Sequence, residues 1–324
     1  MTLPLAPFHE GECAAQERVG VREKLAAVGR HAIRDFMPDQ HREFFSLLPF
    51  VIVGTVDDQG QPWASVLANA PGFIESPRAR ELAIRARPLT ADPLAQTLLA
   101  GAPIGLLGIE PHTRRRNRMN GVVESVTDDS FQVRVTQSFG NCPKYIQARE
   151  AQYVHGDSDA RVEQVVHRTG LNDAALRRII LRADTFFIAS AYPANKRDVS
   201  SAAHGVDVSH RGGKPGFVRV NDDSTLTVPD FSGNLFFNTI GNLLVNPRAG
   251  LLFIDFDNGD LLYLAVESEI IWEGEQVKAI EGAQRLLRLR VRTALRVEAS
   301  LALRWSAAQL SPFLERLEKK VQGQ

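Results

Sequence analysis

Apolar and polar residues form two strand–turn–strand patterns, one in each half of the chain. Residues 50–56 are a continuous apolar run typical of a buried strand, and residues 57–60 are typical of a hairpin turn. Residues 62–69 then predict the returning strand. The second pattern has strands at residues 186–191 and 208–211, joined by a longer loop. We therefore expect one β-rich unit to occur twice.

Apolar residues at helical spacing predict helices around these units. Two helices separated by Pro38 are expected within residues 12–48. Asn172 is the expected N-cap of a connecting helix over residues 173–182, and a further helix is predicted over residues 274–287.

Residues 288–297 alternate strictly, which predicts a strand with one wet or anion-facing side. One face would carry Leu289, Val291, Thr293, Leu295 and Val297, and the other Arg288, Arg290, Arg292 and Arg296. A last amphipathic helix is predicted to begin at Ser311-Pro312.

The two units match each other at an offset of 144 residues. Over residues 65–107, 8 of 43 positions are identical, where composition alone would give roughly three. The matches are Ser65 with Ser209, Pro71-Gly72-Phe73 with Pro215-Gly216-Phe217, Leu82 with Leu226, Leu99 with Leu243, Pro103 with Pro247, and Leu107 with Leu251. The unbroken tripeptide and the shared order of strands and helix indicate a tandem duplication.

Short strands separated by Gly, Pro and Asp turns predict a mainly β chain of the α+β class with two small barrels, rather than a parallel sheet. Neither a Gly-x-Gly-x-x-Gly motif after a strand nor a Walker-type loop occurs. The expected divisions are an N-terminal helical segment over 1–48, a first barrel over 49–148, a helical connector over 149–184, a second barrel over 185–275 and a helix–strand–helix segment over 276–324.

Charge and composition narrow the classes of function. Lys and Arg number 38 and Asp and Glu number 38, so the formal net charge is zero, which argues against general binding of nucleic acid or anionic membranes. No apolar run approaches the length of a membrane span, and residues 1–17 lack the pattern of a secretory signal. We therefore expect a cytoplasmic protein.

Cysteine and histidine residues give no metal-site pattern. Cys13 and Cys142 cannot supply a disulfide framework or a four-ligand zinc site. The eight histidines show no paired-ligand spacing, so no bound metal is expected.

Four positions change toward hydrogen-bonding or cationic side chains in the second unit. At the offset of 144 they are Leu67 to Arg211, Ala70 to Lys214, Thr90 to Asn234, and Leu98 to Asn242. If the unit was duplicated, a binding site kept by one copy should produce this kind of asymmetry.

The start of the predicted helix also differs between the units. In the first unit it reads Asp92-Pro93-Leu94, with a carboxylate at the N-cap and a proline that removes a backbone donor. The matching residues 236–242 have no acid and include Asn238 and Thr239. A helix start with donors and no carboxylate suits a phosphate, and Arg211 could add a guanidinium. Alternatively, Asn238 and Thr239 cap the helix and Arg211 is solvated.

Two polar segments of the first unit are further candidates. Read as a strand, residues 113–121 would place Arg114, Arg116, Arg118 and Asn120 on one face, either to bind an anion or to form a salt-bridged surface. Residues 138–146 predict a tight irregular turn in which Lys144 and Tyr145 could face a conjugated ligand. Cys142 lies in that turn with no nearby activating group and is expected to pack rather than react.

At these segments the chain resembles the pyridoxamine 5'-phosphate oxidase-like superfamily of FMN-binding split β-barrels. The resemblance is carried by residues 113–121 (TRRRNRMNG), 139–146 (FGNCPKYI), 208–217 (VSHRGGKPGF) and 230–247 (DFSGNLFFNTIGNLLVNP). It is most similar to a bacterial branch with two barrels in one chain. The resemblance therefore implies two tandem split β-barrels packed as a pseudo-dimer, with flanking and connecting helices.

In that family FMN lies between two barrels, which implies sites in both units. Carried over, the phosphate and ribityl chain would be held by Ser209, Arg211, Asn238, Thr239 and Asn242, and the flavin would be approached from the first unit by Asn141, Lys144 and Tyr145. Lys214 and Arg116 complete the expected set of cofactor-binding residues. Gly241-Asn242-Leu243 stands where the family often has Ser-Arg-Lys.

The resemblance implies an FMN-dependent oxidoreductase of unknown substrate, in which the flavin carries the redox chemistry. Its partners would be a small-molecule substrate and an electron donor, either NAD(P)H or a separate protein, and dimerisation through the terminal helices stays open. Two alternatives stay open: a flavin- or anion-binding protein without turnover, and a haem-binding or haem-degrading protein using a histidine such as His204 or His210.

Overall fold

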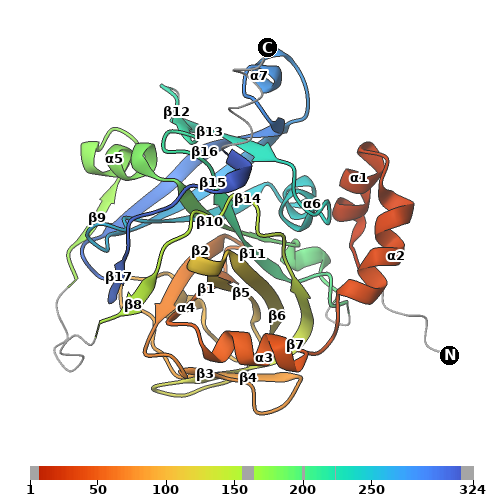
Figure 1. The fold of residues 1–324 in the computed structure, drawn as a ribbon, viewed down its shortest axis with the longest axis vertical. Helices are drawn as coiled ribbons and strands as arrows, with labels where there is room; N and C mark the ends of the chain where they lie inside the picture. Colours follow the sequence, from red (N-terminus) through yellow and green to blue (C-terminus); the bar gives the residue numbers. More distant parts are fainter. Residues whose placement is uncertain (1–6, 155–163, 199–200, 223, 315–324) are drawn as a thin grey trace.

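Two antiparallel sheets with the same strand order make up most of the computed structural model (Figure 1). The structure describes residues 7–154, 164–198, 201–222 and 224–314. The first sheet has the order β2-β1-β5-β6-β7-β4-β3, and the second has the order β11-β10-β14-β15-β16-β13-β12. Strand for strand, the second sheet repeats the first, and the mainly β, α+β class is confirmed.

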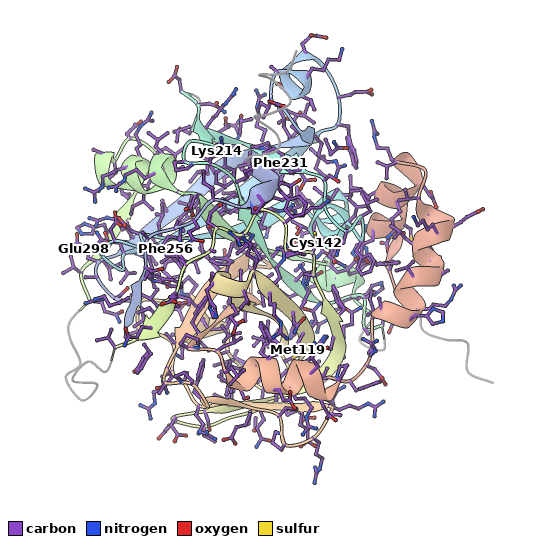
Figure 2. All side chains as sticks on the ribbon, in the orientation of Figure 1. Met119, Cys142, Lys214, Phe231, Phe256 and Glu298 are labelled. Atoms are coloured by element: carbon purple, nitrogen blue, oxygen red, sulfur yellow. The ribbon has the colours of Figure 1, made fainter. Side chains whose placement is uncertain are left out.

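The first sheet belongs to the first half of the chain. Its strands are β1 (Phe50–Val56), β2 (Pro62–Ala68), β3 (Ile74–Glu75), β4 (Glu81–Ile84), β5 (Pro103–Glu110), β6 (Arg115–Val126) and β7 (Phe131–Gly140). Their apolar side chains enclose a core in which Met119 is fully buried (Figure 2). This enclosed core gives the first repeat an interior of its own.

The second sheet follows the same plan. Its strands are β10 (Thr185–Ala191), β11 (Val206–Gly212), β12 (Arg219–Val220), β13 (Thr225–Phe231), β14 (Arg248–Ile254), β15 (Leu261–Ile271) and β16 (Ala283–Val297). The short β9 (Val166–Thr169) pairs with β16, and β8 (Ala151–Tyr153) pairs with β17 (Leu303–Trp305) in a separate ribbon.

Helices occupy the N-terminal segment and the links between strands. They are α1 (Glu10–Arg18), α2 (Arg22–Ala32), α3 (Asp39–Ser46), α4 (Leu94–Thr97), α5 (Ala174–Arg182), α6 (Asn238–Val245) and α7 (Glu275–Lys278), with the 3-10 turns η1 (Pro111–Thr113) and η2 (Ala194–Lys196). In Figure 1, α1 lies beside α6, α2 lies next to α1, and α3 covers the first sheet.

Strand pairing defines which residues of the two repeats are equivalent. Ser65 pairs with Val53 and Ser209 pairs with Ile188, which gives the predicted offset of 144 for β2 and β11. Gly54 and Ala189 are equivalent, because each is the fifth residue of its strand, β1 or β10. Gly54 pairs with Gly105 and Ala189 pairs with Gly250, so from β5 and β14 onward the offset is 145. The predicted equivalences of Pro103 with Pro247 and of Leu107 with Leu251 are therefore wrong by one residue.

The two sheets share a β-bulge at equivalent positions. The register of β6 and β7 shifts between Asn120 and Gly121, and that of β15 and β16 shifts between Ala265 and Val266. Since Asn120 and Ala265 are equivalent, this irregularity is part of the repeated plan.

The sheets pack against each other through a common apolar core. Phe50 and Ile52 of the first repeat are buried there with Phe187, Leu252 and Tyr263 of the second. A methyl group on Gly105 would lie 2.5 Å from the carbonyl oxygen of Val206. On Gly250 it would lie 2.3 Å from the carbonyl oxygen of Pro62, the residue equivalent to Val206. The contact thus has an approximate two-fold symmetry.

Two predictions about helices need correction. The N-cap of α5 is Asp173, not Asn172, because its carboxylate accepts a hydrogen bond from the Leu176 amide. The helix predicted over residues 274–287 ends at Lys278, and β16 already begins at Ala283. Pairing with both neighbouring strands places residues 283–287 in the sheet.

The predicted alternation over residues 288–297 is broken by the bulge. Leu289 and Val291 pack with the core of the second sheet, whereas Leu295 and Val297 pack in the core between the sheets. The prediction of a single apolar face is therefore wrong, because the extra residue at the bulge reverses which side of the sheet the following side chains face.

The observed strands also cross the predicted divisions of the chain. The second sheet continues beyond residue 275 through β16, and the connector over residues 149–184 contains β8 and β9 besides α5. The helix predicted at Ser311-Pro312 is present at residues 312–314, and the rest of that prediction lies outside the described residues.

Candidate functional site

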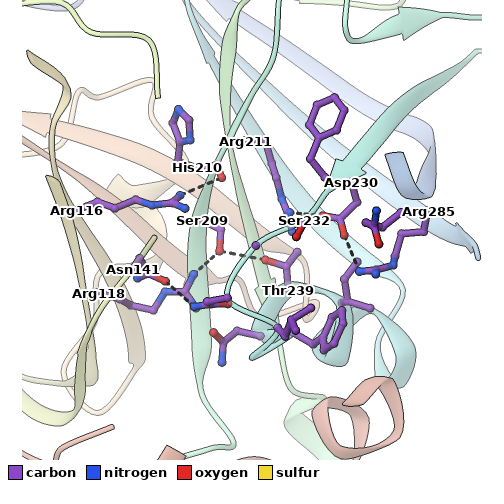
Figure 3. Close-up of a pocket in the computed structure, with 18 residues that line it drawn as sticks. Arg116, Arg118, Asn141, Ser209, His210, Arg211, Asp230, Ser232, Thr239 and Arg285 are labelled. Atoms are coloured by element: carbon purple, nitrogen blue, oxygen red, sulfur yellow. Dashed lines mark hydrogen bonds and ion pairs between the residues drawn. The ribbon is translucent and has the colours of Figure 1, made fainter. Parts of the chain in front are cut away.

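A polar pocket lies between the two repeats, at the start of α6. Figure 3 shows side chains entering it from both sheets. The first repeat contributes Arg116, Arg118 and Asn141, and the second contributes Ser209, Arg211, Asp230, Asn238, Thr239 and Arg285 among others. Counted out to its open mouth, the pocket encloses about 650 Å³.

The first turn of α6 faces the pocket without a side-chain cap. Its N-cap, Phe237, has a left-handed backbone with φ 63° and makes no capping hydrogen bond. Asn238 and Thr239 line the pocket, and the Thr239 hydroxyl donates to the Ser209 hydroxyl at 3.0 Å. The first backbone amides of a helix have no partner within it, and together with the positive dipole end they favour a negative ligand.

Arg118 crosses from the first repeat to the second. It donates to a carboxylate oxygen of Asp207 at 2.8 Å and to the Ser209 hydroxyl. Asp207 also accepts hydrogen bonds from Asn120 and Asn242. Arg118 is 3% exposed, and its Nε, which has no hydrogen-bond partner among the described residues, leaves a buried donor at the pocket wall.

Arg116 contributes a positive charge without a carboxylate partner among the described residues. Its Nε donates to the Cys142 carbonyl at 2.7 Å, and Nη1 donates to the His210 carbonyl at 3.4 Å. Burial, followed by the nearby guanidinium groups of Arg118 and Arg211, lowers the pKa of Arg116 to about 10. The group is still charged at neutral pH and would be stabilised by an anion.

On the other side of the pocket, the Asp230 carboxylate forms ion pairs with two guanidinium groups. Asp230 accepts from Arg211 through one oxygen and from Arg285 through the other, the latter at 2.8 Å. Arg285 also lies over the rings of Phe237 and Trp272. With Arg116 and Arg118 included, four guanidinium groups meet the two carboxylates of Asp207 and Asp230, which leaves two positive charges uncompensated.

The N-terminal helix closes the buried side of this site. Glu12 accepts a hydrogen bond from the Asn238 amide, and His9 lies 3.0 Å from the side-chain oxygen of Asn242. Burial raises the pKa of Glu12 well above its ordinary value, with the negative charge of Asp207 adding to the effect. The neutral form of Glu12 is thereby favoured beside the helix start.

Six of the ten predicted cofactor-binding residues line the pocket: Arg116, Asn141, Ser209, Arg211, Asn238 and Thr239. Asn242 lies behind the wall, bonded to Asp207 and Ser190. Tyr145 packs against Phe231, which lines the pocket, with ring centroids 5.1 Å apart.

Two predicted residues and the arginine cluster differ from expectation. Lys144 lies over the Phe313 ring, and neither it nor Lys214 lines the pocket. Arg114 is outside the arginine face of β6, because its left-handed backbone (φ 58°) ends a 3-10 turn before the strand begins. Arg116, Arg118 and Asn120 do share the predicted face.

Several pocket residues were missed by the sequence argument. Asp230 begins the recognised segment 230–247 but was given no role, and Arg285 comes from a segment without a motif; the pairing of β13 with β16 brings the two together. Glu12, which lies behind the pocket wall, also comes from a segment without a motif. His210 was considered as a haem ligand. Its ring points away from Ser209 in Figure 3 and lies against Phe187, and burial lowers its pKa well below the ordinary value.

Comparisons with known proteins identify the first repeat. Residues 37–164 match the family model described as pyridoxamine 5'-phosphate oxidase. The first repeat is therefore pyridoxamine 5'-phosphate oxidase-like, as the resemblance predicted. No curated protein matches the chain.

Solved structures with low sequence identity include three bacterial proteins. A presumed pyridoxamine 5'-phosphate oxidase from Lactobacillus delbrueckii is 13% identical, with TM-score 0.29, over 39% of this chain and 97% of that one. The haem storage protein HutZ from Vibrio cholerae is 14% identical, with TM-score 0.27, over 40% and 96%. An FAD-binding protein from Mesorhizobium loti is 11% identical, with TM-score 0.25, over 41% and 98%.

Two further properties concern the described residues only. Within them, no helix has the length and apolar content needed to cross a membrane. No three His, Cys, Asp or Glu side chains of the same ranges lie close enough together to hold a metal ion.

Proposed function

We propose that the chain is an FMN-binding flavoprotein whose phosphate site is the pocket at the start of α6, and that it acts as an oxidoreductase on a small-molecule substrate. The observation that carries the proposal is the excess of two positive charges around this pocket, beside an uncapped helix start. A phosphate monoester carries close to two negative charges at neutral pH and would balance them.

Unpartnered polar atoms support a ligand of this kind. Among the described residues, the Asn141 Nδ2 and the Nε atoms of Arg118 and Arg211 are buried without hydrogen-bond partners, and all three residues line the pocket. Leaving such donors unsatisfied costs free energy, which an anionic, hydrogen-bonding ligand would recover. The donor set is thus chemically suited to the phosphate and polar chain of FMN.

The roles of the residues follow from their places. Ser209, Thr239 and the first turn of α6 would hold the phosphate, with Arg116 and Arg118 supplying charge from the other repeat. Asn141 would orient the ligand across the boundary between the repeats. A bound flavin supplies the capacity to accept and donate electrons, which the protein's side chains lack.

Haem is less well supported than flavin. Counted in the same way as the pocket at α6, which has about 650 Å³, the void that the His210 ring shares with Phe187 and Trp305 has about 260 Å³. His204 stacks on Tyr192 with ring centroids 3.9 Å apart. The His210 ring therefore lies in the smaller of these two spaces, whereas His204 lines a separate open groove with Arg80 and Arg197.

The absorption spectrum of the purified protein tests the proposal. We expect two broad visible bands that bleach on reduction, or saturable quenching of flavin fluorescence when the protein is titrated with FMN. Bleaching by NADH or NADPH would identify the electron donor and separate an oxidoreductase from a passive binder. A Soret band, or failure to bind FMN, would contradict the proposal.

A further inference from the structure

The first repeat contains a buried carboxylate held by three donors. Asp92 is 1% exposed. Its Oδ1 accepts from the Ser65 hydroxyl at 2.5 Å and from the Leu94 amide at 2.8 Å, and its Oδ2 accepts from the Tyr263 hydroxyl at 2.7 Å. Tyr263 is on β15, so one of these donors comes from the other repeat.

These donors stand at the positions that line the pocket in the second repeat. Ser65 is equivalent to Ser209, from the pairing of β2 with β1 and of β11 with β10. Tyr263 pairs with Leu252 as Arg118 pairs with Leu107, so Tyr263 is equivalent to Arg118.

The backbone donor is repeated as well. Leu94 and Asn238 are the first residues of α4 and α6, at the offset of 144. The three donors of the first repeat thus have equivalents in the second: the serine is Ser209, the first helical residue is Asn238, and the side chain from the opposite repeat is that of Arg118. In the first repeat these donors hold the carboxylate of Asp92.

In the second repeat the helix start supplies no carboxylate to the corresponding place. Phe236, which stands where Asp92 would, packs instead against Phe8 and Phe139, with ring centroids 5.4 and 5.9 Å away. Among the described residues, the hydrogen bonds of the Ser209 hydroxyl are with Arg118 and Thr239, and these three residues line the open pocket.

We propose that the chain has two oxyanion sites related by its internal repeat, that Asp92 permanently occupies the first, and that only the second accepts an external anion. The donors are the same kind in both places, and carboxylate and phosphate oxygens are the same kind of acceptor. The inference rests on the proposed function only for the identity of the ligand at the open site.

Asp92 excludes a second ligand for two physical reasons. A carboxylate tethered within the site has a high effective concentration, so a free anion cannot compete with it. An added negative charge beside a buried carboxylate would also be strongly repelled. The closed site has Leu261 where the open site has Arg116, so it lacks the cation that a dianion needs. The chain should therefore bind one anionic ligand.

Removing the tethered carboxylate should turn the closed site into a binding site for a small carboxylate. The test is the Asp92→Ala variant, melted in sodium formate or acetate and in sodium chloride of equal ionic strength. We expect the variant to melt below the wild type and to recover about 2–4 °C, saturably, in formate or acetate but not in chloride. If formate raises the melting temperature of Asp92→Ala no more than chloride does, the inference is overturned.

A double variant controls for non-specific salt effects. In Asp92→Ala/Tyr263→Phe the hydroxyl that should hold the added anion is missing, so the recovery in formate should be at least several-fold weaker. The wild type reports any formate that binds at the open second site, so binding at the first site is measured as the excess recovery of Asp92→Ala over the wild type. Equal recovery in the single and double variants would contradict binding at this place.

A titration of the wild-type chain decides the question even if Asp92→Ala does not fold. Calorimetric titration with inorganic phosphate, and separately with FMN, should give one site per chain. Two sites, or none for phosphate, would overturn the inference. One phosphate site without FMN binding would instead contradict the proposed function and leave the inference standing.

Discussion

Arg118 and Tyr263 occupy equivalent positions in the two sheets, and each side chain reaches a polar group of the opposite repeat. Arg118 donates to Asp207 at 2.8 Å and to Ser209, and Tyr263 donates to Asp92 at 2.7 Å. Each repeat thus completes a polar site in the other, so neither site exists until both sheets have packed together.

Arg116→Ala should weaken FMN binding about 10- to 100-fold. The substitution removes a guanidinium whose hydrogen bonds to a charged ligand are worth about 1.5–3 kcal/mol. Fluorescence titration measures the change. The control is Arg114→Ala, because Arg114 donates to the carbonyls of Ile146 and Leu310 outside the pocket. Equal affinities for Arg116→Ala and Arg114→Ala would remove Arg116 from the site.

Tyr263→Phe should lower the free energy of unfolding by about 1–3 kcal/mol, because the buried Asp92 carboxylate loses a donor. Urea denaturation followed by fluorescence gives the difference. Tyr145→Phe serves as the control, since the Tyr145 ring packs against Phe231 and Phe313 and keeps those contacts as Phe. It should change stability by less than about 0.5 kcal/mol. If Tyr263→Phe unfolds at the same urea concentration as the wild type, the hydrogen bond to Asp92 does not contribute to stability.

Gly105→Ala and Gly250→Ala should each destabilise the contact between the sheets by about 1–3 kcal/mol. In each case the added methyl group would meet a backbone carbonyl, at 2.5 Å and 2.3 Å, which cannot rotate away as a side chain could. Thermal melting measures the effect. At Gly170 a methyl group would have no neighbour within 4 Å, so Gly170→Ala is the matched control. If Gly105→Ala and Gly250→Ala melt at the same temperature as Gly170→Ala, the sheets can move apart enough to accept the methyl groups without loss of stability.

The stability of the protein should fall as pH rises from about 4 to about 6, in part because of Asp92. Burial raises the pKa of Asp92 from 3.8 to about 6, against the opposing effect of its hydrogen bonds. In this window the folded state holds a proton that the unfolded state has lost, so raising the pH favours unfolding by up to about 1.4 kcal/mol per pH unit.

Asp92→Asn removes this titration and should flatten that part of the profile. Urea unfolding of both proteins between pH 4 and pH 7 measures the difference, in which titrations common to both, such as that of Glu12, cancel. Parallel profiles for the wild type and Asp92→Asn would show that Asp92 titrates alike in the folded and unfolded states.

Local patterns were enough to predict much of the second repeat's half of the pocket. The run at residues 50–56 coincides with β1, and Asn238 and Thr239 were identified by comparing the two repeats, whereas Ser209 was implied by the family resemblance. This worked because strand alternation and helix starts depend on residues only a few positions apart.

Contacts between distant strands were beyond that reasoning. Arg285 meets Asp230 through the pairing of β16 with β13, in a segment predicted as helix. Glu12 reaches Asn238 because α1 packs on α6, where a methyl group on Gly11 would lie 2.2 Å from the Gly241 carbonyl. Short-range sequence patterns do not predict contacts between segments so far apart in the chain.

The order of residues alone established a mainly β chain, its internal duplication and the polar character of the second helix start, since these follow from local periodicity and repetition. Tertiary packing decided that Arg116 and Arg118 face that helix start, that a bulge reverses the faces of β16, and that Asp92 fills the equivalent place in the first repeat. These features depend on strand register and on how the two sheets meet, and a shift of one residue in either would separate the groups that form the pocket.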